Sequence, residues 1–238
     1  MGPREVLFLY PLVPYTPNFW YVKNGSFFMI EKTFLIAGGN STLLVEGASN
    51  VEKDQIIKNN LGLVEQIGFI TRNDKPSLTM MGNELCINAT IAFASLLYDE
   101  GILLTSGTPN VVRYTNTREI TSISLELPYK QENKTILFEG IGYIMLDEKP
   151  TKEFLMSKCI DYNLPAFGGI VNKGDEIAPF VYVHGTNSYM QETACGSGSI
   201  ATSILTGLTK IFQPTKEPIL VEQNNYLFTV KAKVVRIH

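Results

Sequence analysis

Short runs of β-branched and aromatic residues recur along the chain and predict β-strands. The predicted strands are 42–46, 66–71, 122–127, 135–146, 180–183, 219–222 and 227–237. Neighbouring runs of the hairpin type, as within 135–146, favour antiparallel pairing. This pairing distinguishes the predicted sheet from a doubly wound, nucleotide-binding sheet.

Four further segments have the residue pattern of helices. Ser49 and Glu52 have the spacing of a capping box ahead of 51–60, and Gly62 follows as a natural stop. The other predicted helices are 86–98, 151–162 and 197–211. Because strands outnumber helices, the sequence predicts a mixed fold of the α/β (α+β) class.

An internal repeat divides the chain into halves. The stretches around Cys86 and Cys195 align without a gap: each Cys is followed by a small polar residue at +2, by Ile-Ala at +5 and +6, and by Leu at +10. The offset, 195 − 86 = 109 residues, is close to half the length. Duplication predicts two domains of one design, 1–127 and 128–238, each with a cysteine at the start of a helix.

The charge balance is weakly acidic, with 20 Lys and Arg against 23 Asp and Glu and a net charge of −3. Without basic clusters, neither nucleic acid nor anionic lipid is an expected partner. Pro11, Pro14 and Pro17 interrupt the apolar stretch 6–22, so we expect neither a transmembrane helix nor a signal peptide. These features predict a cytoplasmic protein.

Cysteine and histidine are scarce. Cys86, Cys159 and Cys195 are too widely spaced for a disulfide scaffold, and with only His184 and His238 beside them we expect no metal site and no His-based triad. Neither GxGxxG nor GxxxxGK[ST] occurs, so no dinucleotide or phosphate-loop cofactor is expected. Cys159 has a helical spacing typical of a core residue.

Two cysteines at helix starts have a specific chemical use. Unpaired N–H groups and the helix dipole lower a thiol pKa and favour the thiolate, and the N–H groups of 87–89 and 196–198 can hold a carboxylate. One thiolate could then remove a Cα proton while the opposite thiol protonates the other face. This is racemase or epimerase chemistry without a cofactor. The alternative is that each cysteine is only a small buried residue at a helix start.

The cysteine motifs Glu84-Leu-Cys86-Ile-Asn88-Ala and Ala194-Cys195-Gly-Ser-Gly resemble the two signatures of the diaminopimelate epimerase superfamily of cofactor-independent racemases. Within it, the histidine racemases of opine-type metallophore biosynthesis are most similar. Stretches 38–45, 65–70, 82–90 and 192–198 resemble those racemases in the same order, and the likeness runs from about residue 33 to the C-terminus.

The resemblance implies two similar domains, each a curved mixed sheet around a central helix, with the active site between them. It implies that Cys86 and Cys195 are the acid and base. It also implies substrate contacts from side chains and from a backbone cradle for the carboxylate, at Asn40, Glu65, Asn88, Ala89, Glu192, Gly196 and Ser197. For Asn40 the alternative is a turn former, and for the two glutamates it is a solvated carboxylate.

Two positions depart from the family pattern. Ile87 stands where Gly usually follows the first cysteine, which brings a bulky side chain to the cradle. Thr186-Asn187 stands where the diaminopimelate epimerase has a Glu-Arg pair, so a distal carboxylate would lack its bidentate partner and diaminopimelate is not the expected substrate. Residues 1–32 precede the likeness as an extra leader, which could fill space or form a contact in a homodimer.

Three functions remain open from the sequence. The first is an amino-acid racemase with histidine as the leading substrate. The second is another proton-shifting isomerase or a dehydratase on the same scaffold, which would need only one thiol. The third is a non-catalytic small-molecule binding protein, for which Ile87 is the best argument.

Overall fold

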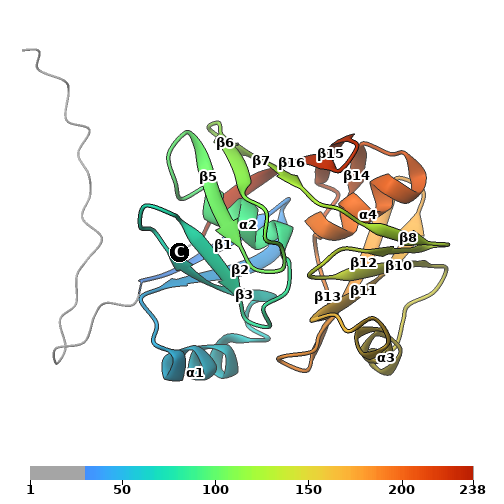
Figure 1. Cartoon of the computed structure of the whole chain (residues 1–238), viewed down its shortest axis with the longest axis horizontal. Coiled ribbons are helices and arrows are strands. Elements are labelled where there is room, and N and C mark those ends of the chain that lie inside the picture. Colours follow the sequence, from blue (N-terminus) through green and yellow to red (C-terminus); the bar gives the residue numbers. More distant parts are fainter. Residues whose placement is uncertain (1–29, 238) are drawn as a thin grey trace, which may run out of the picture.

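The computed structural model describes residues 30–237, so most of the predicted leader 1–32 lies outside the described residues. Two lobes lie side by side, each with a helix enclosed by strands and a second helix on its outside (Figure 1). The predicted mixed fold with two similar halves is confirmed. Among the described residues no helix is long and apolar enough to cross a membrane.

The first lobe contains a curved sheet around the helix α2 (Ile87–Ala94). Its strands are β1 (Ile30–Ile36), β2 (Gly39–Glu46), β3 (Gln66–Thr71), β4 (Ser77–Met80), β5 (Glu100–Thr105), β6 (Val112–Asn116) and β7 (Ile120–Glu126). The helix α1 (Asn50–Asn60) lies outside, packing Ile56 against Ile67 and Phe69 of β3. The predicted capping box of Ser49 and Glu52 is present at its start.

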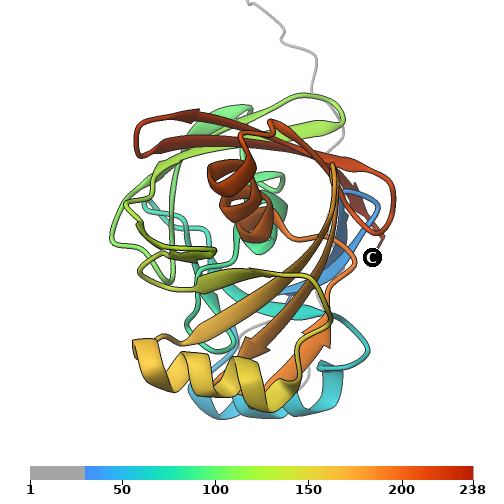
Figure 2. The same ribbon diagram turned by 90° about the vertical axis from the view of Figure 1, so that its right-hand side faces the viewer.

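The second lobe repeats the design around the helix α4 (Gly196–Thr206), which strands surround in Figure 2. Outside it, α3 (Lys152–Tyr162) packs Leu155 and Cys159 against the aromatic core of β11 and β12. The strands are β8 (Lys130–Glu132), β9 (Thr135–Leu137), β10 (Gly142–Leu146), β11 (Ala166–Lys173), β12 (Glu176–Val183), β13 (Ser188–Gln191), β14 (Lys210–Phe212) and β15 (Pro218–Asn224).

The last strand, β16 (Leu227–Arg236), links the halves. It pairs with β15 on one side and with β7 on the other, and its last residues pair with β1. A strand from the end of the sequence thus completes the sheet of the first lobe. Hydrogen bonding is continuous from one lobe to the other through β7, β16 and β15.

The central helices are buried from all sides. Every residue of α2 is buried, as are the first eight residues of α4. Their sequences are apolar or small throughout, as expected of a helix without a solvent face. This burial places both helix starts inside the protein, where water cannot satisfy their free N–H groups.

Three predicted elements are broken or end several residues before the predicted end. The predicted strand 135–146 is two strands, β9 and β10, joined by a turn that includes Gly140. The predicted helix 86–98 ends at Ala94. The predicted helix 197–211 ends at Thr206, because Gly207 adopts a left-handed conformation (φ 77°) that stops the helix before β14.

Candidate active site

Cys86 and Cys195 occupy the same structural position in the two halves. Each is the N-cap of a central helix with an extended backbone. The sulfur of Cys86 accepts from the Ala89 N–H at 3.3 Å, and that of Cys195 accepts from the Gly198 N–H at 3.3 Å. The internal repeat of the sequence is therefore also a repeat of the cap geometry.

The two helix starts are in direct contact. Asn88 Nδ2 donates to the Ala194 carbonyl at 2.8 Å, and Asn88 Oδ1 accepts from the Gly196 N–H at 2.9 Å. Ile87 is fully buried beside Gly196, and a Cβ added to Gly196 would lie 2.5 Å from Ile87 Cγ2. Ile87 therefore packs between the two helices, and the glycine at 196 makes room for it.

A small cavity of about 30 Å³ lies where the helix starts meet. Both thiols line it and both are buried, with 8% of Cys86 and 2% of Cys195 exposed. Of the residues predicted for the site, the cavity is lined by Glu65, Cys86, Asn88, Glu192, Cys195, Gly196 and Ser197. The structure thus brings together residues that are far apart in the sequence.

Asn40 and Ala89 do not line the cavity. Ala89 contributes its N–H to the Cys86 sulfur. Asn40 is the second residue of β2, directly after the turn that joins β1 to β2; it is buried with a positive φ of 45°, and its side chain accepts from Thr42 and donates to Glu65 at 3.4 Å. Glu65 in turn accepts from the Thr193 N–H at 3.0 Å. Asn40 has the geometry of a turn former that also supports Glu65.

Three polar residues of the site were not predicted from the sequence. The Cys86 thiol donates to Gln66 Oε1, and Gln66 Nε2 donates to Glu192 Oε1 at 3.0 Å. The Tyr143 hydroxyl lies 3.2 Å from the Cys195 sulfur. Glu84, which also lines the cavity, accepts from the Gly82 N–H.

Burial dominates the electrostatics of this cavity. It raises the pKa of Glu192 to about 8, and nearby Glu65 and Glu84 add to the effect. It raises the pKa of Glu84 to about 7. Glu192 Oε2 is buried without a hydrogen-bond partner among the described residues. At neutral pH Glu192 is therefore mostly a neutral carboxylic acid.

The expected lowering of the thiol pKa values is wrong. Burial, followed by the charge of Glu192, raises the pKa of both Cys86 and Cys195 well above the ordinary value. The N–H bonds at the helix starts act in the predicted direction but are outweighed, because desolvation of a fully buried anion costs more. Cys159 lies apart in the core under α3, where burial raises its pKa to about 12.

Within residues 30–237 no cluster of His, Cys, Asp and Glu is placed to hold a metal ion.

No protein-family model matches the sequence. Histidine racemases from two strains of Fusobacterium nucleatum are each 28% identical over 202 residues, covering 68% of this chain and 75% and 76% of theirs. Among solved structures, a predicted epimerase from Pseudomonas aeruginosa has a TM-score of 0.61 at 10% identity, covering 87% of this chain and 96% of that chain.

Proteins described as belonging to phenazine biosynthesis have the same fold. One from Clostridium difficile, a putative PhzC/PhzF protein, has a TM-score of 0.57 at 11% identity and covers 88% of this chain and 97% of that one. One from Enterococcus faecalis, of the PhzF family, has a TM-score of 0.55 at 11% identity and covers 88% and 98%. At these identities the likeness concerns the fold alone.

The sequence likeness to histidine racemases makes the chain an isomerase of the racemase and epimerase class, and its fold is similar to that of a predicted epimerase. The resemblance stated from the sequence motifs is confirmed. Within the superfamily, the curated relatives named above are histidine racemases.

Proposed function

We propose that the protein is a cofactor-independent amino-acid racemase that inverts Cα with Cys86 and Cys195, and that histidine is its substrate. The observation that carries the proposal is that two N-cap cysteines from the two halves line one buried cavity. Inversion needs an acid and a base on opposite sides of one carbon atom, and facing helix starts provide such a pair.

The proposed reaction has two proton transfers. The thiolate of one cysteine takes the Cα proton and becomes a thiol, and the electron pair left on Cα is delocalised into the substrate carboxylate. Backbone N–H groups at the helix starts stabilise this charge. The thiol of the other cysteine then protonates Cα from the opposite face and becomes the thiolate.

The raised thiol pKa values suit this reaction. A thiolate that is less stable in its buried site is a stronger base toward a weakly acidic C–H group. Neutral Glu192 supports the thiolate of Cys195, because an ionised carboxylate in direct contact would oppose a second negative charge. Burial of both sulfurs excludes water that would otherwise protonate the intermediate.

The substrate proposal rests on the lining of the cavity and on the curated relatives. Among residues 30–237 no Lys or Arg lines it, so this part of the chain offers an acidic side chain no cationic partner there. Glu192 Oε2, in contrast, has no hydrogen-bond partner among the described residues, and in the neutral carboxyl group its O–H can donate to an imidazole nitrogen. These features favour a side chain with an uncharged hydrogen-bonding nitrogen, as histidine has.

Racemisation assays on cysteine variants test the proposal. Reduced protein, without added pyridoxal phosphate and with a chelator present, is incubated with L- and D-amino acids, and the enantiomers are separated by chiral chromatography. We expect D-histidine from L-histidine, loss of inversion in both Cys86→Ser and Cys195→Ser, and retention in Cys159→Ser. Inversion that persists in either of the first two variants would refute the two-thiol mechanism.

A further inference from the structure

The two proposed catalytic thiols each accept one helix N–H at 3.3 Å and differ in their side-chain partners. Cys86 donates to a carbonyl oxygen, Gln66 Oε1, which favours the protonated thiol. Cys195 instead lies 3.2 Å from the Tyr143 hydroxyl, and Glu192 also contacts it. A hydroxyl group that donates to the sulfur stabilises the anion.

Tyr143 is held in this position from several sides. It is 1% exposed in β10, where it pairs with Gly168 of β11. A Cβ added to Gly168 would lie 2.2 Å from the ring carbon Cε1, so the ring rests directly on the glycine backbone. On the α4 side, a Cβ added to Gly198 would lie 3.5 Å from the same carbon. The hydroxyl therefore has little freedom to turn away from Cys195.

A second hydroxyl fixes the direction of the phenol. Ser197 Oγ lies 2.9 Å from the Tyr143 oxygen but 3.9 Å from the Cys195 sulfur. When Ser197 donates to Tyr143, the phenol hydrogen is free to point at the sulfur, and a chain of donors polarises in that direction. Burial raises the pKa of Tyr143 well above its ordinary value, so the phenol keeps its proton and stays a donor.

We propose that Tyr143 is a positioning residue that favours the thiolate of Cys195 over that of Cys86, so that Cys195 is the first of the two to act as the base. Tyr143 acts through Cys195 and does not line the cavity that the substrate would enter. The charged and titratable groups around Cys195 are Glu192, which contacts it, and Glu65 and Glu84, which act on it through Glu192. This inference rests on the two-thiol reaction proposed above.

The test compares Tyr143→Phe with Tyr182→Phe. Tyr182 is equally buried, at 2% exposed, and loses one hydrogen bond, to Asn187 Oδ1, at a place remote from Cys195. Alkylation by iodoacetamide near neutral pH, read by peptide mass spectrometry, gives the ratio of reaction at Cys195 to that at Cys86 in one sample. Thiolates react and thiols do not, so the ratio reports the resting protonation state.

We expect the ratio to fall severalfold in Tyr143→Phe and to stay unchanged in Tyr182→Phe. The kcat for histidine should fall about tenfold in Tyr143→Phe with little change in KM, because a donor to the reacting base is lost while the cavity lining is intact. Gly168→Ala would displace the Tyr143 ring, because the new Cβ would lie 2.2 Å from Cε1. This variant should therefore also lower the ratio of alkylation at Cys195 to that at Cys86.

The outcomes separate this inference from the proposed function. A ratio that is unchanged or higher in Tyr143→Phe, in a protein that racemises histidine, overturns the role of Tyr143 and leaves the racemase standing. A ratio that falls in a protein that inverts no amino acid supports the role of Tyr143 and overturns the reaction.

Discussion

The side-chain amide of Asn88 holds the backbone N–H of Gly196 at 2.9 Å, across the interface between the two halves. The same amide donates to the Ala194 carbonyl at 2.8 Å. Both ends of one buried side chain thus connect the start of α2 to the start of α4. The position of Cys86 relative to Cys195 depends on this link, since each cysteine caps one of these helices.

Replacing Asn88 with Ala should therefore affect stability and activity together. The substitution leaves a buried N–H and a buried carbonyl unpaired, and we expect the free energy of unfolding in urea to fall by about 2–4 kcal/mol. Racemisation should fall more than tenfold. Asn116→Ala is the matched control, because Asn116 Nδ2 also makes two hydrogen bonds, to Ala94 and Tyr98, but away from the cavity. Full activity in Asn88→Ala would contradict this account of the link.

Ile87 and Gly196 should be coupled energetically. An Ala Cβ at 196 would lie 2.5 Å from Ile87 Cγ2, so Gly196→Ala should cost about 1–3 kcal/mol of stability through overpacking. Ile87→Ala alone should cost about 2–5 kcal/mol, because it leaves a cavity. In the double variant the shortest contact, with Ile87 Cγ2, is removed while contacts of 2.9 Å with the Cβ at 87 and with Asn88 Oδ1 remain, so the combined loss should be smaller than the sum. A double-mutant cycle by urea unfolding measures this, and strict additivity would contradict the contact.

The buried carboxyl groups predict how stability depends on pH. The pKa values of Glu84 and Glu192 are raised from 4.5 to about 7 and about 8. At a pH between 4.5 and the raised pKa, each carboxyl group keeps its proton in the native state but loses it in the unfolded chain. The free energy of unfolding therefore falls as the pH rises through this range. The slope approaches about 1.4 kcal/mol per pH unit for each group.

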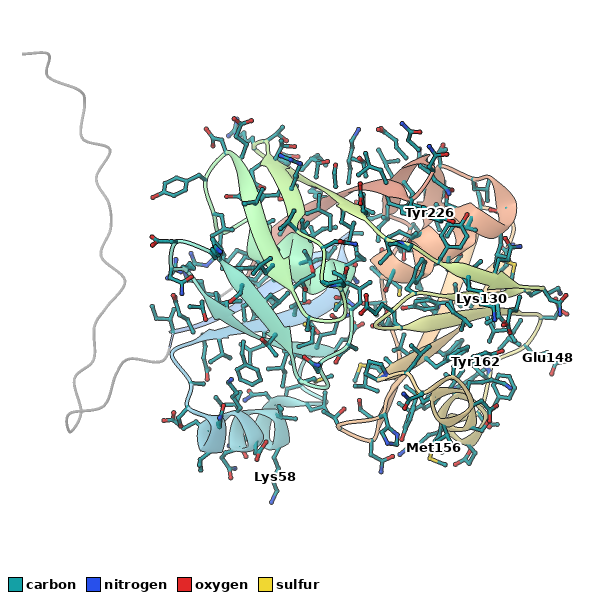
Figure 3. The ribbon with its side chains drawn as sticks, in the orientation of Figure 1. Lys58, Lys130, Glu148, Met156, Tyr162 and Tyr226 are labelled. Atoms are coloured by element: carbon teal, nitrogen blue, oxygen red, sulfur yellow. The ribbon has the colours of Figure 1, made fainter. Side chains whose placement is uncertain are left out.

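Urea unfolding between pH 5 and pH 8 checks this sign, and Glu192→Gln should flatten the slope. Glu148→Gln serves as the control, since Glu148 is exposed at the outer edge of the second lobe (Figure 3). A wild-type stability that rises over this range, or a slope unchanged in Glu192→Gln, would show that Glu192 is ionised in the native state.

Mild oxidation should join Cys86 and Cys195 in a disulfide and abolish activity reversibly. Both thiols line one cavity, whereas Cys159 lies in a separate core cluster and should stay reduced. Peptide mapping after oxidation, followed by reduction and a second activity assay, checks this. If no bond between the two cysteines forms while other oxidation products do, the sulfurs do not approach each other as the site requires.

Periodicity and caps predicted those elements whose signal lies within a short stretch of sequence. The capping box at Ser49, the N-cap cysteines and the strand Gln66–Thr71 are present as expected. The strand Glu100–Thr105 was missed, although it pairs with β6 and β4, because its residues Ile102 and Leu104 are apolar on an exposed face. Its strand character comes from its neighbours, which no local pattern records.

The site was predictable where it carries a repeated motif or lies in a stretch that resembles the racemases, as Glu65 and Glu192 do. The internal repeat contains five residues that line one cavity in the structure: Cys86, Asn88, Cys195, Gly196 and Ser197. Gln66 and Tyr143 sit in ordinary strand sequence, and their roles follow from packing between segments far apart in the chain. The pKa direction failed for a related reason: a local pattern reveals the helix start but not how deeply the sulfur is buried.

Isotope exchange tests the central claim most directly. The reduced protein is incubated in D₂O with L-histidine and a panel of other L-amino acids, and Cα deuteration is followed by mass spectrometry together with chiral analysis. We predict that D-histidine forms with deuterium at Cα, and that this product is lost in both Cys86→Ala and Cys195→Ala. If the thiols are shown to be free and no amino acid of the panel undergoes exchange or inversion, the result contradicts an amino-acid racemase.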